Sequence, residues 1–213
     1  MQAALTVPAK GTTTKDGKFF SFYTKGEEIF NAVSHIVGGG LGIIFWIVLS
    51  VLAYPDPVSL TAVSLFGFGA VALYTMSALY HFLPDGRAKG VFRIFDHCTI
   101  FLLIAGTYSP FCLIALGGTV AGWTVFGLQW GCAALGITMN AIAMNNKAVK
   151  GISMVLYVVM GWMALAVFRQ LFASVSAVSL WLLLAGGIAY TVGIVFFALG
   201  KKIALVSSRL ASV

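Results

Sequence analysis

Four side chains that can do acid–base or metal chemistry lie where one long apolar segment ends and the next begins: Ser77, His81, Asp96 and His97. Ser77 and His81 are four residues apart, so they share one face of a helix. Ionisable side chains inside a membrane span are costly, and a cluster of them indicates a functional site. Imidazole can bind Zn²⁺, a carboxylate can orient bound water, and a hydroxyl can stabilise developing charge. The set predicts metal-assisted hydrolysis, with a proton relay as the alternative.

A second polar face lies near the start of the first apolar segment. Glu28, Asn31 and His35 follow one another at i, i+3 and i+7, and this spacing places them on one helical face. Two polar faces at one membrane depth predict a polar pocket that faces the inside of a helix bundle.

The same residues also allow simpler interpretations. Glu27, at a helix start, and Asp96, close to a basic segment, can be interfacial groups in contact with water or headgroups. His81 can be a hydrogen-bonding group within the bundle. His97 points about 100° away from Asp96 around a helix, which favours a packing or interfacial role.

Composition identifies an integral membrane protein. Of the 213 residues, 60% are hydrophobic and 9% are charged, whereas a soluble domain carries roughly 25% charged residues. The net charge of +7 does not indicate nucleic-acid binding, because the Lys and Arg residues lie at the ends of apolar runs instead of forming a stripe. Cys98, Cys112 and Cys132 lie in apolar segments without paired spacing, so we expect them to be ordinary packing residues.

The expected fold is all-α, with six transmembrane helices in a single bundle. Residues 1–26 are expected to form a flexible tail, residues 27–200 the bundle, and residues 201–213 a short C-terminal tail. Pro110 is expected to bend the third span. The spans are predicted at about 32–53, 58–82, 94–116, 120–144, 152–168 and 178–199.

The distribution of basic residues predicts the orientation of the bundle. Twelve of the thirteen Lys and Arg residues fall in the two tails and in the connections after spans two and four, and only Arg169 falls on the other side. This bias places both termini in the cytoplasm. The polar faces described above then lie at the cytoplasmic side of the membrane.

Glycine is abundant within the predicted spans, as at Gly38–Gly40, at Gly127 and Gly131, and at Gly186 and Gly187. Small residues let membrane helices approach closely, so these positions are expected to mark packing faces. Packing of Gly127 and Gly131 between two copies in a homo-oligomer is the alternative to packing within one chain.

In the polar stretches around Glu28, His81 and Asp96, the sequence resembles the haemolysin III family, the bacterial branch of the progestin and adipoQ receptors. The resemblance covers about residues 26 to 200. It rests on four stretches: Glu28-Ile-Phe-Asn31-Ala-Val-Ser-His35, Ser77-Ala-Leu-Tyr-His81, Phe95-Asp96-His97 through Ala105-Gly-Thr-Tyr-Ser-Pro110, and Leu184-Ala-Gly-Gly-Ile-Ala-Tyr190 through Phe197.

The resemblance implies a seven-helix fold in the bacterial plasma membrane, a cytoplasmic N-terminus and a zinc site near the cytoplasmic face. His81 matches the zinc ligand of the second span, Asp96 matches the carboxylate that holds the zinc-bound water, and Ser77 matches the serine beside them. Related proteins are regarded as lipid-amide hydrolases or lipid-signalling receptors. The bacterial branch is named for haemolysis and associated with membrane-lipid homeostasis, so membrane lipids are the expected partners.

The sequence departs from the family pattern after the sixth span. The family's seventh span supplies two further histidines, whereas this chain continues from Lys201 to Val213 without a histidine. We therefore expect six spans and an incomplete zinc site, since a catalytic zinc normally has three protein ligands. A pore-forming cytolysin or channel, and a receptor-like membrane protein without catalysis, are the alternative functions.

Overall fold

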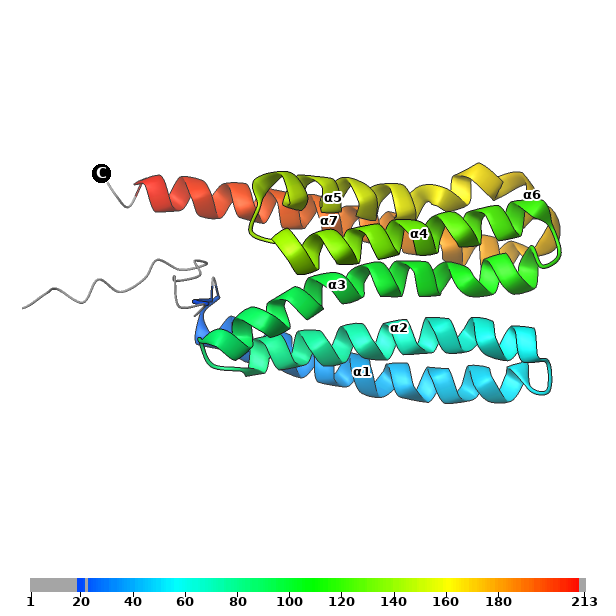
Figure 1. Ribbon diagram of the computed structural model, residues 1–213, viewed down its shortest axis with the longest axis horizontal. Helices are drawn as coiled ribbons and strands as arrows, with labels where there is room; N and C mark the ends of the chain where they lie inside the picture. The colour runs from blue at the N-terminus through cyan, green and yellow to red at the C-terminus, as the bar shows by residue number, and fades with distance from the viewer. Residues whose placement is uncertain (1–18, 22, 211–213) are drawn as a thin grey trace, which may run out of the picture. The chain divides into compact units, whose positions relative to one another are not determined.

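The chain folds almost entirely as helix. The computed structural model describes residues 19–21 and 23–210, with side chains to residue 196, and the described part contains helices and one isolated β-bridge but no strand (Figure 1). The prediction of an all-α fold is confirmed. The elements are α1 (Lys25–Ala53), α2 (Pro57–Phe82), α3 (Arg87–Pro110), the π-helical segment η1 (Phe111–Ala115), α4 (Val120–Ala143), α5 (Lys147–Trp162), the 3₁₀ segment η2 (Met163–Val167), α6 (Phe168–Ser174) and α7 (Ala177–Leu210).

Within the part of the chain that the structure describes, six segments are long and apolar enough to cross a membrane, as predicted. They correspond to α1, α2, α3 with η1, α4, α5 through α6, and the part of α7 up to Phe196. Several boundaries differ from the prediction. The fifth span runs from Lys147 to Ser174 instead of about 152–168. The basic segment after α2 is not a loop but the first two turns of α3, and α7 continues to Leu210 instead of ending near Leu199.

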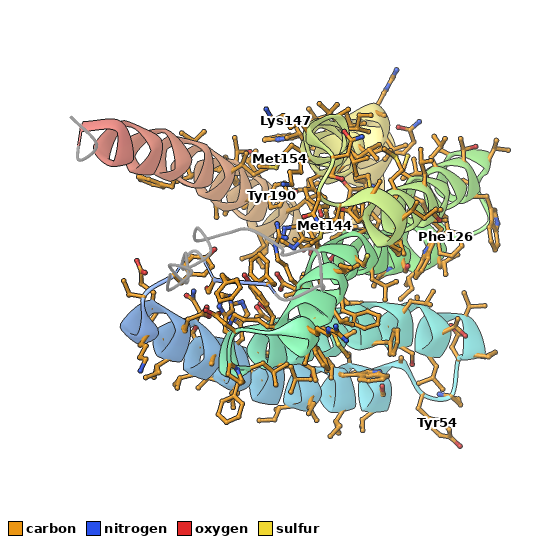
Figure 2. The ribbon with its side chains drawn as sticks, turned by 60° about the vertical axis from the view of Figure 1, so that its left-hand side comes forward. Tyr54, Phe126, Met144, Lys147, Met154 and Tyr190 are labelled. Carbon is orange, nitrogen blue, oxygen red and sulfur yellow. The ribbon has the colours of Figure 1, made fainter. Side chains whose placement is uncertain are left out.

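The chain divides into two compact units, residues 1–160 and residues 161–213. In the first unit, α1 to α4 lie side by side and antiparallel in chain order (Figure 1), and α2 packs between α1 and α3. The start of α1, the end of α2 and the start of α3 therefore meet at one end of the unit. Tyr54, in the turn between α1 and α2, marks the opposite end (Figure 2).

The second unit consists of the end of α5, η2, α6 and α7. Within it, α6 contacts both η2 and α7. The indole Nε1 of Trp162 donates a hydrogen bond of 3.1 Å to the hydroxyl of Thr191, which ties the end of α5 to α7.

Local capping explains where α1 and α2 begin. The Thr24 side chain accepts a hydrogen bond from the Glu27 N–H, and the Glu27 carboxylate accepts one from the Thr24 N–H at 2.7 Å. This capping box starts α1 at Lys25, two residues before the expected Glu27. At α2, the Asp56 carboxylate accepts a hydrogen bond of 2.7 Å from the Ser59 N–H, and Pro57 occupies the first helical position.

Close helix packing occurs at Gly38, one of the glycines singled out in the sequence, and at further glycines. A Cβ at Gly38 of α1 would lie 2.7 Å from the Tyr74 ring in α2. A Cβ at Gly106 of α3 would lie 2.7 Å from the backbone oxygen of Leu65 in α2, so only glycine allows these helices to approach this closely. A Cβ at Gly127 or Gly131 would meet no atom within 4 Å. The α-helical part of the third span ends at Pro110, where η1 follows.

Part of the segment predicted as a tail packs against the turn between α2 and α3. Phe19 is fully buried and forms an antiparallel bridge with Gly86, with N–O distances of 3.0 and 3.1 Å. Gly86 has a φ of 157°, which a residue with a side chain rarely adopts. The Arg93 guanidinium lies 4.6 Å from the centre of the Phe19 ring. Residues 1–18 lie outside the described part of the chain.

Candidate functional site

The carboxylate of Glu28 joins α1, α2 and α3 at the end of the first unit where these helices meet. Its Oε2 lies 2.6 Å from Nδ1 of His81 in α2, and its Oε1 lies 3.0 Å from Nζ of Lys89 in α3. The Ser21 hydroxyl, from the segment before α1, also donates to Oε1. We call these four residues, Ser21, Glu28, His81 and Lys89, the Glu28 network.

Lys89 is the most deeply buried member of the network, with 1% of the residue exposed. Besides its contact with Glu28, its ammonium donates to the backbone oxygens of Tyr80 and Leu83, at 3.0 and 2.9 Å. An ammonium has three donors, and here each has an acceptor. The two carbonyls belong to the last turn of α2 and its cap, which lack partners within the helix. A single side chain of α3 therefore caps α2 and neutralises the carboxylate of α1.

Aromatic rings surround His81. The His35 ring stacks on the His81 ring with centroids 5.9 Å apart and an interplanar angle of 19°, and the Tyr23 ring meets it edge-on at 5.3 Å. His35 is held by a 2.7 Å hydrogen bond between its Nδ1 and the backbone oxygen of Asn31. Burial, followed by the negative charges of Asp96 and Glu28, raises the pKa of Tyr23. Tyr23 is therefore kept as a neutral phenol beside the network.

Asp96 forms a second group with Ser77 and His97. Ser77 is buried, and its hydroxyl lies within hydrogen-bonding reach of the Asp96 carboxylate. His97 Nδ1 lies 3.5 Å from Asp96 Oδ2 and donates to the backbone oxygen of Arg93 at 3.0 Å. Because His81 also interacts electrostatically with Asp96, the second group lies close to the Glu28 network.

The structure brings together most of the residues singled out in the sequence. Glu28, His35 and His81 are in contact because α1 and α2 are neighbours, and Asn31 takes part through its backbone oxygen. Neither hydrogen bonds nor ring contacts link His97 directly to His81 among the described interactions, and His97 instead lies beside Asp96.

Three residues of the site were not predicted: Ser21, Tyr23 and Lys89. Ser21 and Tyr23 lie in a polar segment without periodicity, so the sequence gives no signal for them. Lys89 has the sequence context of a charge that sets membrane topology. Its burial depends on α3 beginning at Arg87, and the run of helix-compatible residues from Arg87 to Phe92 is the signal that could have shown this.

The described side chains do not form a metal site with three ligands. No three His, Cys, Asp or Glu side chains within the described ranges are placed to hold one ion. Nδ1 of His81 faces the Glu28 carboxylate, and Nδ1 of His35 faces the backbone oxygen of Asn31. The zinc that the resemblance implies would need protein ligands in addition to His81, because Asp96 matches the residue that holds the zinc-bound water.

Fold and site together define a polytopic helical membrane protein with a buried acid–base network at one end of its bundle. Residues 23–204 match the Haemolysin-III related family, and the chain belongs to that family. It is 37% identical over 173 residues to Hemolysin-3 of Bacillus cereus, covering 80% of this chain and 78% of that protein. It is 36% identical over 183 residues to the Hemolysin-3 homolog of Bacillus subtilis strain 168, covering 85% and 84% respectively. No solved structure matches the chain.

Proposed function

We propose that this haemolysin III-family protein serves membrane-lipid homeostasis through hydrolase-like acid–base chemistry on membrane lipids. The observation that supports this proposal best is the 2.6 Å contact between Nδ1 of His81 and the Glu28 carboxylate, made by an imidazole with 8% of the residue exposed. The carboxylate accepts a hydrogen bond from the Nδ1–H of the imidazole. This bond fixes the tautomer in which Nε2 carries the lone pair and can take up a proton. An imidazole oriented in this way is a suitable general base.

The expected reaction is hydrolysis of a lipid amide. His81 Nε2 takes a proton from water, the resulting hydroxide attacks the carbonyl carbon, and the C–N bond of the tetrahedral intermediate breaks. The proton on Nε2 then passes to the leaving amine, so that His81 returns to its starting state. The Ser77 hydroxyl is proposed to turn from the Asp96 carboxylate to the carbonyl oxygen as that oxygen gains charge, while Asp96 orients the attacking water.

Zinc remains an implication of the family resemblance. Bound zinc would supply Lewis-acid activation of water. The described residues do not fit a three-ligand zinc site, so each step above uses only side chains of this chain.

Hydrolysis by purified protein in liposomes that contain a fluorogenic lipid amide tests the proposal. His81→Ala is expected to lower the rate by about 10²–10⁴. Glu28→Gln should lower it as well, whereas Glu27→Gln is the matched control, because Glu27 is exposed and glutamine also satisfies a capping box. Equal rates in wild type and His81→Ala, or an equal loss in Glu27→Gln, would refute the proposed role of the Glu28 network.

A pore-forming cytolysin is the second candidate, and the names of the two relatives favour it. It predicts that liposomes loaded with a self-quenched dye leak when the protein is reconstituted at low density. Leakage that persists in His81→Ala would support this function independently of hydrolysis. Liposomes that stay sealed at all protein densities would count against it.

We propose further that the protein resides in the bacterial plasma membrane with its N-terminus in the cytoplasm. This orientation is supported by the sequence, which places twelve Lys and Arg residues on one side of the membrane and only one on the other. Reporters that are active only in the cytoplasm should be active when fused before residue 1 and silent when fused at Tyr54. The reverse pattern would invert the proposed topology.

A further inference from the structure

A pocket of about 530 Å³ lies between the first turns of α3 and the end of α4. Its lining comes from residues 87–94 of α3 and residues 140–146, which form the last turn of α4 and the turn to α5. Met144 and Lys147 mark this turn in Figure 2. The volume falls in the range of about 300–1,000 Å³ that is typical of small-ligand sites.

The pocket carries positive charge. Arg87 and Arg93 line it, and neither lining segment contains an Asp or Glu. Lys150, in the first turn of α5, is close enough to Arg93 for their charges to repel. The negative charge of Asp96 attracts the Arg93 guanidinium. A negatively charged ligand in the pocket would relieve the repulsion between Arg93 and Lys150.

Hydrogen-bond donors accompany these charges. Nη1 of Arg93 donates to the side-chain oxygen of Asn145 at 3.3 Å, and this bond directs the guanidinium toward the α4–α5 turn. Asn145 and Asn146 also place amide groups in the lining. Guanidinium groups bind phosphate oxygens through two parallel hydrogen bonds, and amide N–H groups donate to the same oxygens.

The position of the pocket favours one class of phosphate compound as its ligand. The start of α3 and the end of α4 are ends of membrane-spanning segments, so the pocket lies at the depth of lipid headgroups. Basic pockets between the ends of transmembrane helices suit anionic headgroups. We propose that this pocket binds the phosphodiester headgroup of an anionic phospholipid, at a site distinct from the Glu28 network.

Native mass spectrometry of the full chain with phosphatidylglycerol, phosphatidylcholine or inorganic phosphate tests this site. The wild type is expected to retain phosphatidylglycerol in preference to phosphatidylcholine. Arg87→Gln should weaken that binding by about five-fold, the effect of one basic residue near a charged membrane surface. Asn145→Asp, which places a carboxylate against Arg93 without changing side-chain size, should weaken it at least as much. Lys25→Gln, a basic residue outside the pocket, should leave it unchanged.

The outcomes separate the alternatives. Unchanged phosphatidylglycerol binding in Arg87→Gln, or an equal loss in Lys25→Gln, would overturn the site in favour of general surface charge. Inorganic phosphate that binds with the same dependence on Arg87, while the lipid does not bind, would overturn the lipid as the ligand. If Asn145→Asp fails to fold, Arg87→Gln decides the question, because Arg87 is exposed.

Discussion

Nζ of Lys89 lies 3.0 Å from Oε1 of Glu28, on the same carboxylate whose Oε2 faces His81 at 2.6 Å. The two oxygens of the Glu28 carboxylate therefore have partners from different helices, Lys89 from α3 and His81 from α2. Glu28 cannot rotate away from His81 without breaking its contact with Lys89. The orientation of the imidazole thus depends on a residue of α3 that does not touch it.

The Glu28–Lys89 pair is expected to be energetically coupled. Lys89→Met leaves the Glu28 carboxylate without its main charge partner, and Glu28→Gln removes the negative charge that faces the buried ammonium. Each change should lower the free energy of unfolding by roughly 1–3 kcal/mol, because each leaves a largely buried charge less well compensated. Urea unfolding in mixed micelles provides the measurement.

The double variant separates this coupling from general damage. If the pair interacts directly, the combined loss should be smaller than the sum of the single losses by at least about 0.5 kcal/mol. Strictly additive losses would show that the contact between Glu28 and Lys89 contributes nothing to stability.

Substitution at Gly106 is expected to push α2 and α3 apart. Gly106→Ala places a methyl group 2.7 Å from the backbone oxygen of Leu65, and backbone cannot move aside as a flexible side chain can. Overpacking of this kind costs about 1–3 kcal/mol. The matched control is Gly127→Ala, where the new Cβ meets no atom within 4 Å and the helical propensity of alanine is higher. Unfolding in mixed micelles should show a loss in the first variant only.

The sequence predicts the six spans, and it marks most of the residues that meet at the end of the first unit, since both depend on local pattern. Hydropathy locates six apolar segments, and i, i+4 spacing places Ser77 and His81 on one helical face. Contact between Glu28 and His81 follows once α1 and α2 are taken as neighbours.

Long-range contacts explain what the sequence does not predict. Lys89 reads as one more basic residue near a membrane surface, and its burial follows only from the way α3 turns back against the end of α2. The close approach at Gly106 depends equally on which faces of α2 and α3 meet. The spacing of Gly127 and Gly131, in contrast, draws attention to two positions where an added Cβ would meet no atom within 4 Å.

Asp56 gives a pH dependence that can be measured outside the membrane spans. Hydrogen bonds from the Ser59 hydroxyl and N–H hold the pKa of the Asp56 carboxyl below its usual value. A pKa that is lower in the folded state gives stability that is present above the unfolded value of about 3.9 and is lost as the pH falls through the folded value. The melting temperature of wild type should therefore fall toward that of Asp56→Asn in acid, because asparagine accepts the same bonds without titrating. A difference between the two proteins that does not change with pH would contradict the role of this cap.

Zinc content tests how far the family's metal chemistry extends to this chain. No group of three His, Cys, Asp or Glu side chains that could hold an ion includes His81 among the described residues, and catalytic zinc normally has three protein ligands. Protein purified and dialysed against a weak chelator is therefore expected to hold less than one zinc per chain, and His81→Ala should hold the same amount. His97→Ala is the matched histidine variant, since His97 is held by the Arg93 backbone oxygen and not by Glu28. One zinc per chain that is lost in His81→Ala and kept in His97→Ala would show that His81 is a metal ligand, and the acid–base role proposed for its Nε2 would then be wrong.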